Sequence, residues 1–168
     1  MSVEAEFVSS ARRRFADVGR RLETTVGRLG PDDLEWRPNP ESNSVSNLVL
    51  HVCGNLRQRF HAGLGGAPDT RDRPAEFGDR AAHTAAELVS LLRATFAEVD
   101  AVLAALPAER LTATTSVGGP AQSVTSLLLG AVCHASEHLG QVIYISKERL
   151  GGRFEALWQP GPPQSPGV

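Results

Sequence analysis

Apolar residues recur every three or four positions along four separate stretches of this chain, and no stretch shows sustained strand-like alternation. This spacing places apolar side chains on one face of an α-helix. Helices of about 20 residues with a single apolar face bury those faces most simply by packing on one another. The sequence therefore predicts an all-α fold, a four-helix bundle. The expected helices cover residues 2–29, 44–64, 84–106 and 123–150.

The connection between the second and third expected helices, residues 67–82, is polar and has no helical periodicity. A helix of about 20 residues is about 30 Å long, whereas about 16 extended residues span about 50 Å. The connection is therefore long enough to cross the whole bundle. This allows the second and third helices to run parallel.

Proline and glycine mark the other connections. Two prolines exclude a helix from residues 32–43, and residues 108–122 are expected to form a loop. Residues 153–168 contain four prolines, and we expect an extended or disordered tail there. The predicted organisation is a bundle over residues 1–152 followed by this Pro-rich C-terminal tail.

Charge and cysteine content narrow the classes of function. The chain has 17 Lys and Arg against 19 Asp and Glu, which argues against a nucleic-acid partner. No apolar run reaches the roughly 18 residues of a membrane span. Two cysteines are too few for a disulfide framework, and the first residues are acidic, unlike a secretory signal. We therefore expect a cytoplasmic protein with no membrane partner.

Three histidines are the candidate metal ligands. His134 and His138 are four residues apart in the last expected helix, one turn apart on the same face. His51 lies at the edge of the apolar stripe of the second expected helix. If these helices face each other, three imidazoles converge and leave an open position, which is typical of catalytic metal sites. His61, on another face, and His83, outside the helices, are excluded.

Simpler interpretations also exist, because a buried histidine is most often a hydrogen-bonded core residue. The segment from His134 to His138 also matches the H-x-x-E-H pattern of inverzincin proteases. Those enzymes need a larger mixed fold, and Glu137 is rotated away from the two histidines.

Cys53 and Cys133 flank the histidines in sequence. We expect them to be small buried thiols, with metal ligation as the alternative.

Three motifs carry a resemblance to a known family over residues 5–150. The chain resembles the DinB/YfiT-like superfamily of metalloenzymes, in an uncharacterised bacterial branch. The motifs are Leu34-Glu-Trp36-Arg-Pro38, Ser44-Val-Ser-Asn-Leu-Val-Leu-His51 and His134-Ala-Ser-Glu-His138-Leu-Gly-Gln141.

The resemblance implies a four-helix bundle with a long crossover after the second helix. It also implies one divalent metal held by His51, His134 and His138. Zinc and nickel are expected first, while iron, cobalt and manganese are alternatives. Characterised relatives are transferases or isomerases that use a low-molecular-weight thiol. The resemblance therefore implies a thiol, a small-molecule substrate and a homodimer.

Three polar residues lie near the predicted ligands in sequence. Asn55 is one turn beyond His51, Arg59 is a further turn on, and Gln141 is one turn beyond His138. We expect them to contact a cofactor or substrate or to orient the ligands. The alternative is that they are ordinary polar residues at the edge of the bundle.

Three functions are compatible with these features. The first is a metal-dependent thiol S-transferase, in which the metal lowers the pKa of the thiol, with a metal-dependent hydrolase as a close variant. The second is a non-catalytic metal-binding or stress-response bundle. The third is a helical dimerisation module whose histidines belong to the core. The sequence assigns no catalytic residue.

Overall fold

The computed structural model describes residues 2–117 and 119–155. Four long helical segments form the predicted bundle: α1, α3 with its continuation η1, α5 and α6. The π-helix η1 and the two 3₁₀ helices, η2 and η3, are short. In chain order the elements are α1 (Val3–Val26), α2 (Pro31–Glu35), α3 (Val45–Leu56), η1 (Arg57–Leu64), α4 (Arg73–Gly78), α5 (Ala85–Ala104), η2 (Ala108–Thr112), β1 (Thr114–Thr115), β2 (Gln122–Ser123), α6 (Val124–Leu150) and η3 (Gly151–Arg153).

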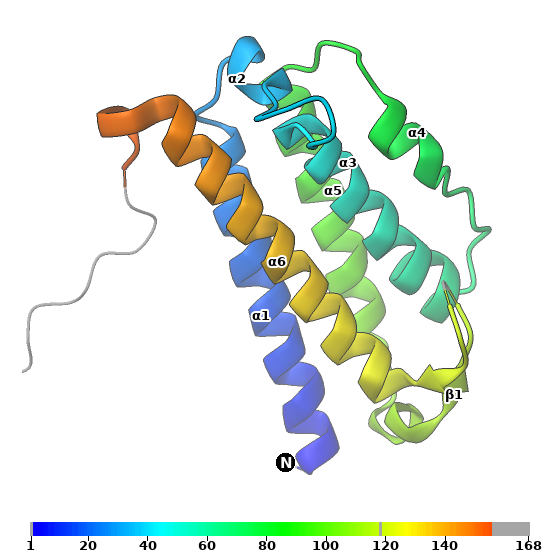
Figure 1. Ribbon diagram of the computed structural model, residues 1–168. Coiled ribbons are helices and arrows are strands. Elements are labelled where there is room, and N and C mark those ends of the chain that lie inside the picture. The colour runs from blue at the N-terminus through cyan, green and yellow to red at the C-terminus, as the bar shows by residue number, and fades with distance from the viewer. Residues whose placement is uncertain (1, 118, 156–168) are drawn as a thin grey trace, which may run out of the picture.

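The direction of the helices confirms the long crossover. α1 and α6 run one way and α3 and α5 run the other, so α3 and α5 are parallel (Figure 1). The connection between them carries α4 and returns along the outside of α3 (Figure 1). α1 and α3 each pack against both α5 and α6. The faces of α3 and α6 that carry the three histidines can therefore meet.

A side-chain cap defines where each of the four long helices begins, and at the start of α1 Ser2 accepts a hydrogen bond from the amide of Ala5. Ser44 accepts a hydrogen bond from the amide of Asn47 at the start of α3, at 3.2 Å. Thr84 and Glu87 form a reciprocal capping box at the start of α5. Ser123 caps α6 by accepting a hydrogen bond from the amide of Ser126. These starts agree with the predicted ones because caps are local interactions that the sequence displays directly.

The short helices α2 and α4 lie in segments where we predicted no helix, so that prediction was wrong for both. Pro31 in α2 and Pro74 in α4 fall in the first turn. Proline is tolerated there because the amide at that position has no intrahelical acceptor. Asp72 also accepts a backbone hydrogen bond and caps α4.

The connection expected to be a loop, residues 108–122, contains η2 and a minimal antiparallel ladder. Thr114 of β1 lies opposite Ser123 of β2, and Thr115 lies opposite Gln122. Each strand has only two residues, so the ladder pairs two short parts of this connection and forms no larger sheet. It joins α5 to α6 at the end of the bundle where α1 begins (Figure 1).

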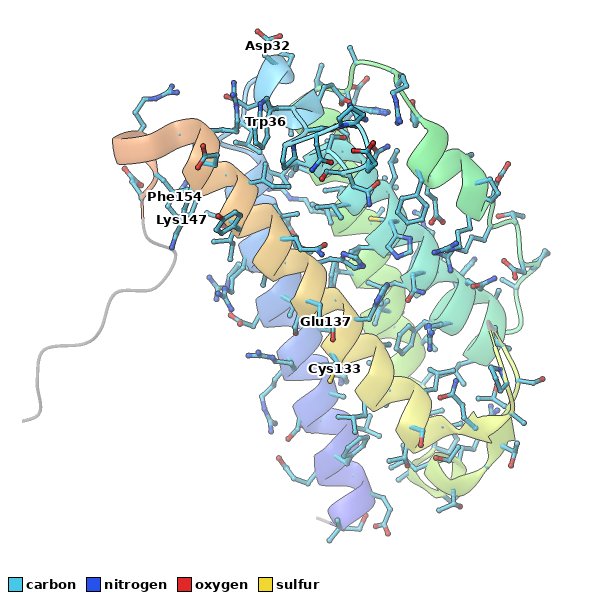
Figure 2. All side chains as sticks on the ribbon, viewed as in Figure 1. Asp32, Trp36, Cys133, Glu137, Lys147 and Phe154 are labelled. Carbon is cyan, nitrogen blue, oxygen red and sulfur yellow. The ribbon has the colours of Figure 1, made fainter. Side chains whose placement is uncertain are left out.

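The predicted apolar stripes form the core, with Leu22 of α1, Leu92 of α5 and Leu127 of α6 fully buried. After α6, Phe154 lies beside Lys147, whose Nζ is 5.6 Å from the ring centroid (Figure 2). Most of the predicted Pro-rich tail, residues 156–168, lies outside the described residues. No helix in the described part of the chain combines the length and apolarity needed to span a bilayer.

Candidate metal centre

His51 of α3 meets His134 and His138 of α6 inside the bundle. Each offers a ring nitrogen, and these three nitrogens lie within 4.8 Å of one another. The Nε2 atoms of His51 and His134 are 3.0 Å apart. His51 is 5% exposed, while the other two are half-buried. The tertiary fold thus brings together the three histidines that the sequence analysis selected.

The arrangement of the rings fits a single divalent cation. The ring planes of the three pairs are nearly perpendicular, at 80°, 82° and 88°, with centroids 4.4 to 5.1 Å apart. The rings are therefore not stacked on one another. Ligand nitrogens about 2.1 Å from a tetrahedral zinc lie about 3.4 Å from each other. Spacing and donor type both suit zinc, nickel, cobalt or iron.

A carboxylate from the crossover orients His51. Nδ1 of His51 lies 2.9 Å from Oε2 of Glu76 in α4. An ionised carboxylate only accepts, so Nδ1 carries the proton and donates it. Nε2 therefore keeps its lone pair and directs it toward the other two histidines. Carboxylate partners of this kind fix the tautomer of metal-binding histidines in proteins.

Glu76 is held in turn by Arg71. The Arg71 Nε donates to Oε1 at 2.7 Å and its Nη2 donates to Oε2 at 2.9 Å. Both side chains are less than 10% exposed, so each charge is neutralised mainly by the other. Arg71 Nη1 also donates to Gln58 at 2.9 Å. This bidentate pair fixes the carboxylate beside His51.

Gln141 orients His138 in the same way as Glu76 orients His51. Nδ1 of His138 lies 2.7 Å from Oε1 of Gln141, one turn further along α6. An amide oxygen is an acceptor, so this Nδ1 carries the proton and Nε2 is left free. Gln141 thus contacts a candidate ligand, as expected from its spacing. Its role in metal binding stays a prediction.

Asn55 and Arg59 line a cavity of about 420 Å³ together with His51 and His134. Among the described residues, neither Oδ1 of Asn55 nor Nε of Arg59 has a hydrogen-bond partner, and both atoms are buried. The cavity gives a small molecule access to two of the three candidate ligands. The predicted contact residues Asn55 and Arg59 are therefore placed beside the site, whereas Gln141 lines a different hollow.

Comparison with known proteins places the chain in a family. The sequence model described as "Protein of unknown function (DUF1572)" matches residues 2–161. The chain belongs to this family. None of the curated proteins compared with the chain matches it.

Two solved structures share the fold of this DUF1572 member. One is the DinB-like protein YjoA of Bacillus subtilis, with 17% identity, a TM-score of 0.68, and coverage of 89% of this chain and 96% of that one. The other is a DinB-like protein of Bacillus cereus ATCC 10987, with 13% identity, a TM-score of 0.66, and coverage of 85% and 90%. At such identities the likeness concerns the fold alone. It confirms the DinB-like helical bundle that the sequence motifs indicated.

The two cysteines differ in environment. Cys53 is buried, as predicted, and burial raises the pKa of its thiol to about 11. The prediction of a buried thiol was wrong for Cys133, which is exposed on α6 one turn before the exposed Glu137 (Figure 2). The reason is that Cys133 lies off the apolar stripe of its helix. Neither cysteine joins the group of three histidines among the described residues.

The remaining histidines lie apart from the site, in agreement with their exclusion. His61 is exposed, and His83 contacts Asp79 at 2.9 Å. Glu76 and Arg71 were not among the predicted site residues. Asp72 and Pro74 carry a local signal for the start of a helix, but nothing in the sequence indicates that this helix packs on His51.

The electrostatic environment favours neutral imidazoles. Burial lowers the pKa of His134 to about 4, and the cationic forms of His138 and His51 act in the same direction. Burial also lowers the pKa of His51, against the raising effect of its hydrogen bond to Glu76. Metals bind the neutral form of imidazole. At neutral pH the environment of His51 and His134 therefore favours the form that binds metal.

Gly54 makes the approach of Glu76 possible. A Cβ atom at this position would overlap Oε1 of Glu76 and lie 2.9 Å from its Cδ. Gly54 precedes Asn55 in the last turn of α3, close to His51. Any larger residue there requires the carboxylate to move.

Acidification should destabilise the metal-free protein through His134. Histidine in an unfolded chain titrates near pH 6.5, whereas folding lowers the pKa of His134 to about 4. Between these values the unfolded state binds a proton that the folded state does not, so stability falls as the pH falls from about 6.5 to 4. We expect His134→Gln to reduce this loss, measured by urea unfolding midpoints across that range. At pH 7.5 His134 is neutral in both the folded and the unfolded protein, so the unfolding midpoints there report only the effect of the substitution on packing. A variant with the wild-type pH dependence contradicts the prediction.

Gly54→Ala should displace Glu76 from His51. We expect a loss of about 1–3 kcal/mol in the free energy of unfolding and faster solvent exchange of the His51 Nδ1 proton, followed by NMR. Gly130→Ala in α6 is the matched control, because nothing lies within 4 Å of its added Cβ. It should be neutral or stabilising by up to about 1 kcal/mol. Equal stability of the two variants, with the His51 proton still protected, would show that Glu76 is free to move.

Proposed function

We propose that this protein is a divalent-metal-dependent enzyme that transfers a low-molecular-weight thiol to a small-molecule electrophile. The observation that carries the proposal is the convergence of the three histidines beside a cavity. Three protein ligands leave a coordination position for an exogenous molecule, as in catalytic rather than structural sites. The thiol itself is supported by the resemblance to thiol-dependent DinB/YfiT-like enzymes.

His51, His134 and His138 would hold the cation, with zinc or nickel as the first candidates. A divalent cation there supplies the positive charge that lowers the pKa of a bound thiol, so that thiolate forms at neutral pH. Glu76 keeps the lone pair of His51 directed into the site, and Gln141 does the same for His138. These residues set the ring orientation before any ligand arrives.

The cavity between η1, α4 and α6 is the proposed substrate site. It is lined by His51 and His134, so a molecule in it adjoins the proposed metal position. The unpartnered Oδ1 of Asn55 is available to accept a hydrogen bond from the substrate. The homodimer that the resemblance implies remains a prediction, and so does the cytoplasmic location expected from the cysteine content and the acidic first residues.

Each of the three histidines should be needed for metal binding. We expect His51→Ala, His134→Ala and His138→Ala each to lower zinc and nickel affinity more than 100-fold, since even loss of a ligand's hydrogen-bond partner costs about 10–100-fold. The measurements are elemental analysis of untagged protein and competition with a chelator. His61→Ala, outside the group, should bind metal like the wild type. Full affinity in any one of the three variants removes that residue from the proposed site.

Metal-loaded protein should accelerate the conjugation of a thiol to an electrophile. With monochlorobimane, the thiolate sulfur forms a bond to carbon and chloride leaves, which gives a fluorescent product. Glutathione, mycothiol and bacillithiol should be compared, each with metal-free protein and with His51→Ala as controls. Stoichiometric metal without turnover on any thiol or electrophile would contradict the transferase and leave a non-catalytic metal-binding bundle.

A further inference from the structure

We propose that the cavity beside the three histidines binds an anionic group, a carboxylate or a phosphate, through Arg59 and Arg73. The proposal deepens the proposed function, on which it rests for the placement of this anion on the substrate. Besides the two histidines, the cavity is lined by Asn55, Gln58, Arg59, Arg71 and Arg73. Three guanidinium groups thus face one hollow whose lining contains no carboxylate.

The charge of Arg71 is already balanced, but the charges of the other two arginines are not. Arg71 is paired with the buried Glu76. Among residues 2–117 and 119–155, Arg59 and Arg73 form no ion pair and no side-chain hydrogen bond. Arg57, which lies in η1 with Arg59, does pair with Glu98, at 2.9 Å. The cavity therefore carries an excess of positive charge, although the whole chain has a net charge of −2.

Arg59 is the strongest indication of a missing partner. Its Nε is buried without an acceptor in the described structure. Leaving a buried donor unsatisfied is costly, and more so for a charged group. Burial and the neighbouring Arg71 both lower the pKa of Arg59. A bound anion would supply the counter-charge that Arg59 lacks and relieve the repulsion between the two guanidinium groups.

Arg73 and Asn55 complete the recognition site. The guanidinium of Arg73 lies over the ring of Phe77, 5.1 Å from its centroid, a cation–π contact that uses none of its N–H groups in a hydrogen bond to oxygen. The buried Oδ1 of Asn55 is an unused acceptor in the same cavity. The site thus offers donors for an anionic oxygen and one acceptor for a hydroxyl, thiol or amine.

The size of the cavity limits the ligand to a small molecule. A volume of about 420 Å³ is within the range of small-molecule sites. Guanidinium groups bind carboxylates and phosphates through paired hydrogen bonds. An anion on the substrate, held by Arg59, would place a neighbouring part of the molecule beside His51 and His134.

The test is calorimetric titration of succinate and of inorganic phosphate into metal-free and zinc-loaded protein. We expect binding that weakens with ionic strength, and a loss of about tenfold or more in Arg59→Gln and Arg73→Gln, since one charge-assisted hydrogen bond contributes that much. Arg110→Gln removes an exposed arginine that does not line the cavity and should change affinity less than twofold. Tighter succinate binding identifies a carboxylate site, and tighter phosphate binding a phosphate site.

The titrations of metal-free protein distinguish a failure of the anion site from a failure of the proposed metalloenzyme. Anion binding that depends on Arg59, in a protein that takes up no metal, supports the anion site and overturns the metalloenzyme. Stoichiometric zinc with no anion binding in either form overturns the anion site and leaves the metal centre intact. Equal affinities of Arg59→Gln and wild type also overturn the anion site. Circular dichroism of each variant checks that the bundle is folded.

Discussion

The packing of α3 against α6 is the contact on which the site depends. Each helix contributes a buried apolar stripe, and burial of these stripes sets the rotation of one helix relative to the other. That rotation places Nε2 of His51 3.0 Å from Nε2 of His134. Three imidazoles thus meet at the edge of the core, where burial lowers the pKa of His51 and of His134. The candidate metal centre therefore follows from the way the core packs.

The crossover between η1 and α5 supplies residues of the candidate site as well as joining the helices. Glu76 orients His51, and Arg71 neutralises Glu76 and also lines the cationic cavity. One buried ion pair therefore joins the candidate metal centre to the proposed anion site. Gly54 leaves the space that this pair needs against α3. In this arrangement the candidate metal position and the proposed substrate cavity are adjacent, and His51 belongs to both.

Much of the site was predictable because helical spacing is local information. The pairing of His134 with His138 follows from one helical turn, and the cap at Ser44 fixes the phase of the helix that presents His51. The same spacing predicted that Asn55 and Arg59 lie near His51. The prediction for Cys133 failed because it rested on the usual burial of cysteine side chains and did not follow the apolar stripe of the helix. Helical spacing also gave no sign of Glu76, whose segment shows no periodicity.

The sequence by itself determined four amphipathic helices, their caps, a connection long enough to cross the bundle, and three histidines suited to one cation. Each of these follows from interactions between residues a few positions apart. Only the tertiary structure decided that Glu76 and Arg71 lie against His51, and that two arginines without ion pairs face the same cavity. Those contacts join segments from different helices, and their geometry is set by how the apolar faces pack together.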